Sequence, residues 1–235
     1  RHYKKGPRSS LVSLEAARAN VTPINFDNYT PKKPNKLGVT VLNELDLNEV
    51  RNYIDWTPFF MTWQLSGKYP LILKHEVIGT EATNLFNDAN AMLDDVINNK
   101  KITAKAVFGL FPANSDVDDL IVYSDETRSE KIMNLHQLRQ QSKKPAGQFN
   151  RCLSDYVAGK NSGVEDYVGA FAVSSGFGVD ELVKVYDGDH DAYNSILLKA
   201  VADRLAEASA EYLHEKVRKE YWGYAADEAL DNDAL

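Results

Sequence analysis

The chain has 235 residues, of which 43% are hydrophobic, and a formal net charge of −7 at pH 7. This length and composition suffice for one large or two small globular domains with a packed core. The acidic balance argues against a nucleic-acid-binding protein, whose interface needs clustered Lys and Arg. The basic cluster at the N-terminus lies beside Gly6 and Pro7 and is typical of a solvated linker; it consists of Arg1, Lys4, Lys5 and Arg8.

Cysteine usage and hydropathy narrow the class of protein further. The single cysteine, Cys152, excludes an intramolecular disulfide framework and a multi-cysteine zinc or iron–sulfur site within the chain. We therefore expect a reducing compartment, the cytoplasm. No run of 18 apolar residues occurs, and no charged segment precedes an apolar one, so the sequence predicts neither a membrane span nor a secretory signal.

Residues 1–36 are predicted to form a linker and an N-terminal strap. The segment is rich in proline, which favours extended structure in the residue before it; the prolines are Pro7, Pro23, Pro31 and Pro34. One short helix is expected over residues 14–18, with Ser13 as its N-cap.

The next hundred residues alternate between strand and helix patterns. Residues 38–42 predict a strand, and residues 46–54 a short helix capped by Asp46. Residues 76–99 carry apolar side chains at helical spacing and predict a long helix.

Two further strands are expected after that helix, at residues 103–111 and 119–123, joined by a loop over residues 112–116. Residues 130–138 fit either a strand or a helix.

The last third of the chain predicts one strand followed by helices. The strand covers residues 166–173, and Ser174–Gly178 is interpreted as the turn into the first helix. Residues 179–222 are helical, with a break near residues 187–189. Helices flanking hairpin-like strands indicate an α+β fold, which we expect as a single domain over residues 37–235 with a curved, mainly antiparallel sheet and a long C-terminal helix.

Asp55 stands in the most aromatic stretch of the chain, Tyr-Ile-Asp-Trp-Thr-Pro-Phe-Phe-Met-Thr-Trp at residues 53–63. A carboxylate away from water is costly unless donors surround it. The two Trp, two Phe and one Tyr provide flat walls for a planar ligand, and Asp55 is an acceptor for an ammonium, a sulfonium or a hydroxyl. The alternative is that Asp55 simply caps a helix that includes Pro58.

The last helix carries carboxylates at strict four-residue spacing, an arrangement we call the acidic ladder: Asp203, Glu207, Glu211 and Glu215. Like charges at this spacing destabilise an isolated helix by roughly 0.2 to 0.5 kcal/mol per pair. The ladder is either a solvated face relieved by neighbouring Arg and Lys, or one of its members points into a ligand cleft. Glu211 and His214 match only half of a di-iron motif, which we interpret as a chance match.

Six blocks, in order along the chain, closely resemble the C-terminal reactivation domain of cobalamin-dependent methionine synthase. They are the stretch at residues 53–63, Gly-Leu-Phe-Pro-Ala-Asn at 109–114, Asp-Glu-Thr-Arg at 125–128, Leu-Arg-Gln-Gln at 138–141, Asp-Tyr-Val-Gly-Ala-Phe-Ala-Val at 166–173 and Ala-Asp-Arg-Leu-Ala-Glu-Ala at 202–208. The similarity extends from about residue 10 to the end.

The resemblance implies a domain that binds S-adenosylmethionine and presents its methyl group for reductive remethylation of cob(II)alamin. Asp55 and Glu207 match acidic residues of the ligand site, and no catalytic or metal-binding residue is implied within this chain. The cobalamin and the zinc of the enzyme belong to other domains of the polypeptide, and the electron comes from flavodoxin or a flavoprotein reductase.

The family also has an Arg-x-x-x-Gly-Tyr segment after the region that matches residues 221–224, and this chain stops before it. We therefore expect a C-terminally incomplete domain, taken from a longer protein, that alone binds S-adenosylmethionine weakly and is inactive. Two alternatives are a docking module for the cobalamin domain and a flavodoxin-type donor, and a free-standing methyltransferase built on the turn at Ser174–Gly178. An antiparallel sheet would exclude the second.

Overall fold

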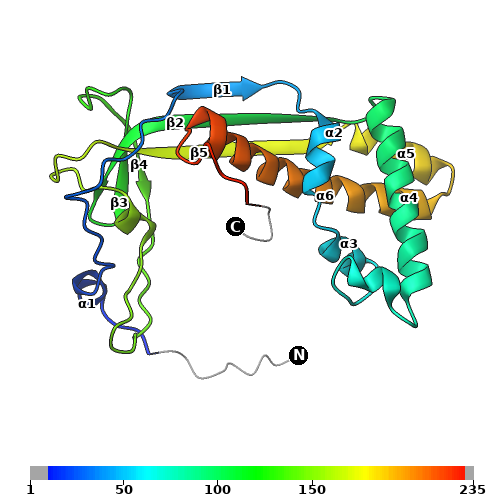
Figure 1. Ribbon diagram of the computed structural model, residues 1–235, viewed down its shortest axis with the longest axis horizontal. Helices are drawn as coiled ribbons and strands as arrows, with labels where there is room; N and C mark the ends of the chain where they lie inside the picture. The colour runs from blue at the N-terminus through cyan, green and yellow to red at the C-terminus, as the bar shows by residue number, and fades with distance from the viewer. Residues whose placement is uncertain (1–9, 231–235) are drawn as a thin grey trace. The chain divides into compact units, whose positions relative to one another are not determined.

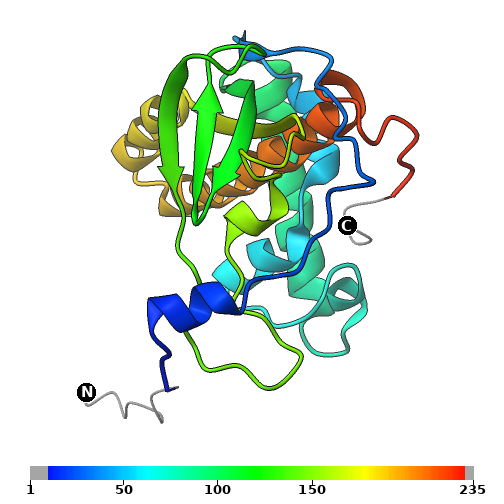
Figure 2. The same ribbon diagram turned by 90° about the vertical axis from the view of Figure 1, so that its left-hand side faces the viewer.

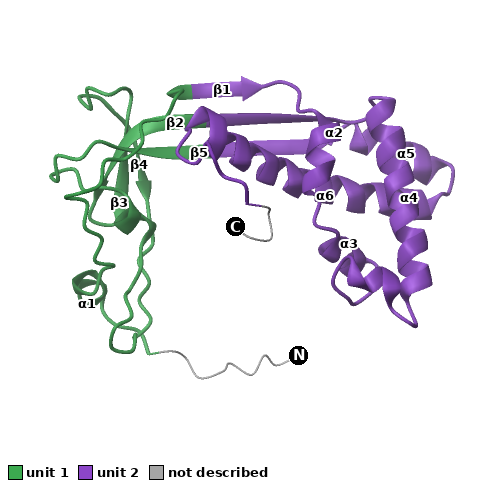
Figure 3. Ribbon diagram, viewed as in Figure 1, with its two compact units in different colours: residues 1–38, 109–170 green, residues 39–108, 171–235 purple. Residues whose placement is uncertain are grey.

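The computed structural model describes residues 10–230, which form two compact units. Of these residues, unit 1 comprises 10–38 and 109–170, and unit 2 comprises 39–108 and 171–230 (Figure 3). The basic cluster of the N-terminus lies outside the described residues.

The helices of the described chain are labelled in Figure 1, and most of them begin at a capping side chain. They are α1 (Leu14–Ala19), α2 (Leu47–Val50), α3 (Trp56–Thr62), α4 (Gly79–Asn98), α5 (Val179–Gly188) and α6 (Ala192–Lys216), with short 3-10 turns at Arg51–Tyr53, Leu71–Lys74 and Leu153–Tyr156 and a π turn at Val217–Tyr221. Ser13 and Asp46 cap α1 and α2 as predicted: Ser13 Oγ accepts from Ala16 N at 3.1 Å, and Asp46 Oδ1 accepts from Asn48 N at 2.9 Å.

Five strands form one sheet: β1 (Gly38–Leu42), β2 (Thr103–Asp116), β3 (Asp119–Tyr123), β4 (Lys131–His136) and β5 (Asp166–Phe177). Their order is β1-β2-β3-β4, and β5 also pairs with β2. Both β2 and β5 contribute residues to the two units. The sheet is mainly antiparallel, which confirms the predicted α+β class and excludes the methyltransferase built on a parallel sheet.

Unit 1 contains the meander β2-β3-β4, whose three strands lie side by side in green in Figure 2. Asn114 pairs with Ile121 and Ser115 with Leu120, so the predicted loop at residues 112–116 is wrong. These residues continue β2, and the chain turns only at Val117 and Asp118, where Val117 has φ +59°.

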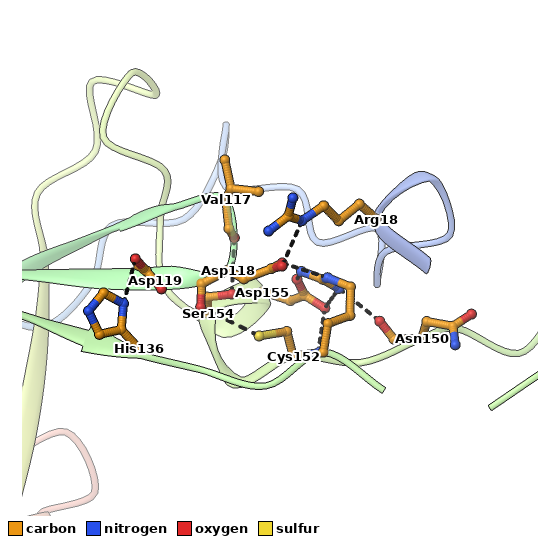
Figure 4. Close-up of polar contacts among 10 residues, drawn as sticks. Arg18, Val117, Asp118, Asp119, His136, Asn150, Cys152, Ser154 and Asp155 are labelled. Carbon is orange, nitrogen blue, oxygen red and sulfur yellow. Dashed lines mark hydrogen bonds and ion pairs between the residues drawn. The ribbon is translucent and has the colours of Figure 1, made fainter. Parts of the chain in front are cut away.

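A buried ion cluster fixes the N-terminal segment within unit 1 (Figure 4). Asp118 accepts from Arg18 Nε and from Arg139 Nε, both at 2.7 Å. The backbone adds a bond from Val12 N to Gln141 O at 2.9 Å. Charged groups this deep in a protein persist only when each finds an opposite charge or a hydrogen bond. The cluster therefore holds α1 against the β2–β3 turn.

In unit 2, α4 and α5 both pack against α6. The apolar faces predicted for α4 and α6 are buried in the core of this unit. The side chains exposed by at most 1% include Leu93, Val96, Leu197, Leu198, Val201 and Leu205. The predicted break in the last helical region occurs at residues 189–191, between α5 and α6. Among residues 10–230, no helix combines the length and apolarity that crossing a bilayer requires.

Candidate functional site

Asp55 is the N-cap of α3, as the simpler of its two interpretations predicts. Its Oδ1 accepts a hydrogen bond from Thr57 N at 2.9 Å. The residue is exposed, and capping uses only one carboxylate oxygen. Asp55 is therefore held in one orientation while Oδ2 stays available to a ligand.

A cavity of about 920 Å³ in unit 2 lies beside this carboxylate. We call it the Asp55 cavity. It is lined by Asn52, Tyr53, Ile54, Asp55, Trp56, Thr57, Met61, Gly67, Lys68, Tyr69, Glu215 and Leu230. Its volume falls in the range of about 300 to 1,000 Å³ that small-molecule sites occupy, and its lining mixes aromatic rings with a few charged groups.

The aromatic stretch at residues 53–63 divides between this cavity and the core. Tyr53 and Trp56 line the cavity, whereas Phe59 and Phe60 are 0% exposed. Trp56 packs edge-on against Phe86 of α4 at 4.8 Å between ring centroids, which fixes its plane. Of the five rings offered as walls, two therefore line this cavity, the two Phe rings stabilise the fold, and Trp63 lines a different cavity.

The loop that contains Lys68 and Tyr69 completes the wall of the Asp55 cavity, and no sequence motif predicts it. Tyr69 N donates to Thr57 Oγ1 at 3.2 Å, which joins the loop to the first turn of α3. This bond brings Lys68 and Tyr69 to the cavity. This hydrogen bond involves a backbone N–H and one threonine hydroxyl, so no residue pattern in the sequence predicts that the loop lies here.

Glu215 of α6 reaches the same cavity and is held by two partners. Its Oε2 accepts from Tyr53 Oη at 2.7 Å, and its Oε1 accepts from Lys219 Nζ at 2.6 Å. The hydrogen bond from Lys219, and then that from Tyr53, lowers the pKa of Glu215. Burial, followed by the hydrogen bond to Glu215, raises the pKa of Tyr53 to about 12. At neutral pH the pair is therefore a carboxylate and a protonated phenol.

Glu207, the second residue singled out by the sequence, lies elsewhere on α6. Its carboxylate pairs with Arg204, its side chain is 57% exposed, and it is not among the residues lining the Asp55 cavity. Asp203 pairs with the same guanidinium at 2.6 Å. The structure brings Asp55 and Glu215 to one cavity, and Glu215 is the member of the acidic ladder that lines it.

The remaining candidate motifs have structural roles. His214 Nδ1 lies 3.0 Å from Arg218 Nη1, and its ring stacks on Phe171 at 6.2 Å. In the part of the chain that the structure describes, no group of three or more His, Cys, Asp and Glu side chains is arranged to hold a metal.

The predicted turn at Ser174–Gly178 is shorter than expected. Ser174–Phe177 form the end of β5, and only Gly178 turns, with φ +95°. Ser175 is buried, and its hydroxyl lies against that of Ser209 on α6. Strand pairing and helix packing account for these residues without a ligand.

Comparison with known proteins assigns this arrangement to a family. Residues 46–235 match the family described as vitamin B12 dependent methionine synthase, activation domain. A crystal structure described as the MetH reactivation domain bound to AdoHcy superimposes with a TM-score of 0.91 and 54% sequence identity. That match covers 95% of this chain and 68% of the other.

Proposed function

Because the chain belongs to the family of activation domains of vitamin B12 dependent methionine synthases, we propose that the Asp55 cavity binds S-adenosylmethionine. The ligand supplies the methyl group for reductive remethylation of cob(II)alamin, which a cobalamin-binding domain of the same polypeptide holds. The observation that carries the proposal is the cavity itself: Asp55, aromatic rings and a lysine converge on a space of the right size. The similar reactivation domain bound to AdoHcy supports the ligand class.

The chemistry of the ligand suits the lining residues. S-adenosylmethionine carries an ammonium, a carboxylate, a sulfonium, ribose hydroxyls and a flat adenine. Asp55 Oδ2 is suited to accept from the ammonium or a hydroxyl. The resemblance gives the ligand carboxylate to the arginine of the Arg-x-x-x-Gly-Tyr segment, and Lys68 is a further cation of the lining. Tyr53, Trp56 and Tyr69 present rings to the adenine or the sulfonium.

The domain acts by positioning. No side chain of the cavity needs to transfer a proton, since the methyl group leaves the sulfonium as the reaction proceeds. Holding donor and acceptor in a near-attack arrangement is worth up to about 7 to 11 kcal/mol of the barrier. Activity thus requires the rest of the enzyme, and we propose that the domain alone is inactive.

Other parts of the proposal rest on the resemblance alone. Glu207 is proposed as a second acidic residue toward the ligand, although it lies outside the lining of the Asp55 cavity. Flavodoxin or a flavoprotein reductase is proposed as the electron donor, and the cytoplasm as the location. We also propose residues 1–36 as the strap that links residues 37–235, the reactivation domain, to the preceding part of the enzyme. The separate docking function is not favoured, because a similar domain has a bound ligand of this class.

Calorimetric titration of S-adenosylmethionine against the full-length enzyme tests the site. Asp55→Asn keeps a side chain able to cap α3 but removes the charge. We expect it to weaken binding about tenfold or more, the usual effect of losing a charged hydrogen bond. Asp46→Asn, at the N-cap of α2, is the matched control and should bind like the wild type. Unchanged affinity in Asp55→Asn removes Asp55 from the site.

A further inference from the structure

The four carboxylates of the acidic ladder are held in different ways. Asp203 and Glu207 share Arg204, and Glu211 is exposed. Glu215 differs from the other three because it lines the Asp55 cavity. One negative charge of α6 is therefore presented to whatever occupies this space.

The charge of Glu215 is fixed in place at the wall. Its side chain is 23% exposed, and both oxygens accept hydrogen bonds, one from Tyr53 and one from Lys219. The Tyr53 ring packs edge-on against Tyr212 at 5.6 Å, so the phenol that holds the carboxylate is itself held. Lys219 is not among the residues lining the cavity, so of this ion pair only the Glu215 carboxylate faces the cavity.

Two carboxylates and one ammonium therefore line the cavity: Asp55, Glu215 and Lys68. A zwitterionic amino-acid group needs one carboxylate for its ammonium and one cation for its own carboxylate. The second carboxylate is left facing the part of the ligand that carries any further charge. In S-adenosylmethionine that part is the sulfonium, and in S-adenosylhomocysteine it is a neutral thioether.

We infer that Glu215 makes the Asp55 cavity select the sulfonium ligand, S-adenosylmethionine, over the thioether, S-adenosylhomocysteine. The inference rests on the proposed function. Ammonium, carboxylate and adenosine are common to both ligands, so only the sulfonium charge distinguishes them. A unit charge about 4 Å from an opposite charge changes affinity about fivefold even at the dielectric constant of water, and more in a cavity.

This preference has a consequence for turnover. Methyl transfer breaks the bond between the methyl carbon and sulfur, and the sulfur keeps the electron pair, so the ligand changes from a cation to a neutral thioether. Its attraction to Glu215 is lost in the same step. The spent ligand is therefore released more readily than the methyl donor, and a new donor molecule replaces it.

The test measures the dissociation constants of both ligands by calorimetry, with full-length methionine synthase carrying each substitution. For Glu215→Gln we expect the preference for S-adenosylmethionine to fall about fivefold or more, with the affinity for S-adenosylhomocysteine changed less than twofold. Glu211→Gln makes the same change at an exposed position of α6 and should leave the preference unchanged.

A second variant, expected to change the preference in the opposite direction, distinguishes an effect of charge from a structural one. Lys219→Met removes the cation that compensates Glu215 and should increase the preference for S-adenosylmethionine. Equal losses of affinity for both ligands in Glu215→Gln, or an unchanged ratio in either variant, overturn the inference while leaving the proposed function intact. If the wild-type enzyme binds neither ligand, the proposed function fails and the inference fails with it.

Discussion

Arg139 and Asp155 form a bidentate ion pair inside unit 1, with Arg139 Nη2 donating to Asp155 Oδ1 at 2.6 Å and Nη1 to Oδ2 at 3.0 Å. Their side chains are 2% and 5% exposed. Arg139 also donates from Nε to Asp118, and Asp155 Oδ2 accepts from Cys152 N at 3.0 Å. The pair therefore connects the β2–β3 turn to the 3-10 turn at Leu153–Tyr156.

Asp155→Asn should destabilise the chain by about 3 kcal/mol. The substitution leaves the Arg139 guanidinium buried with one carboxylate instead of two, and breaking a buried pair usually costs about 3 to 5 kcal/mol. Urea unfolding at pH 7 measures the loss. Asp27→Asn makes the same change at an exposed position of the same unit and should cost less than about 0.5 kcal/mol. Equal stability of the two variants would show that the ion cluster contributes nothing to folding.

Stability should fall in acid because of the same cluster. Burial alone would raise the pKa values of Asp118 and Asp155. Hydrogen bonds from Arg18 and Arg139 to Asp118, and from Arg139 to Asp155, outweigh burial and hold both pKa values below the ordinary 3.8. A carboxyl with a lowered folded-state pKa stabilises fully above its unfolded pKa and loses that contribution as the pH falls through the folded value.

We therefore expect the urea midpoint to be nearly constant from pH 7 to about pH 5 and to fall steeply below about pH 4. Asp155→Asn removes one of the two titrating groups, so its profile should be shallower in acid. Parallel profiles for the wild type and the variant contradict the assignment of the acid transition to this cluster.

The sequence predicted the helices well because their signals are local. The apolar stripes of α4 and α6 and the capping residues Ser13 and Asp46 act within a few residues of themselves. The predicted strand ends were wrong where residues that usually form turns, at positions 112–116, instead continue a paired strand. Asn114 belongs to a strand because its amide donates to Ala158 O and Val164 O, both at 3.0 Å. Such partners, more than 40 residues away, leave no trace in local composition.

Of the candidate site, the sequence singled out Asp55 but not Glu215, because only the signal for Asp55 is local. Asp55 stands out by its aromatic neighbours, which are adjacent in sequence. Glu215 and Glu207 have equivalent positions in a four-residue repeat, so spacing alone does not distinguish them. What distinguishes them is Tyr53, 162 residues away, whose hydroxyl bonds to Glu215.

Gly178→Ala should destabilise unit 2 by about 2 kcal/mol or more. Gly178 has φ +95°, and a Cβ atom there would lie 2.3 Å from Lys101 O. Both the left-handed backbone and the contact with a carbonyl disfavour alanine. Gly188→Ala is the control, because a Cβ atom at that position would meet nothing within 4 Å. Urea unfolding should show a loss for the first variant and little change for the second, and similar midpoints would mean that the β5–α5 turn relaxes without cost.

Glu228→Gln should loosen the segment that follows α6. Arg218 Nη2 donates to Glu228 Oε2 at 2.7 Å and Nε donates to the same oxygen at 2.9 Å, with side chains 7% and 11% exposed. Gly223, with φ +81°, lets the chain turn back so that Glu228 meets Arg218 and Leu230 reaches the Asp55 cavity. Without the carboxylate charge, the Arg218 cation remains buried beside a neutral amide, which destabilises the closed arrangement.

Amide hydrogen exchange over residues 224–230 measures this opening directly. Exchange through local opening speeds up in proportion to the opening equilibrium, so the loss of a buried ion pair should accelerate it at least about tenfold. Asp227→Asn changes an exposed carboxylate of the same segment and should leave exchange unchanged. If Glu228→Gln exchanges like the wild type, Leu230 is held at the cavity by apolar contact and not by the Arg218–Glu228 pair.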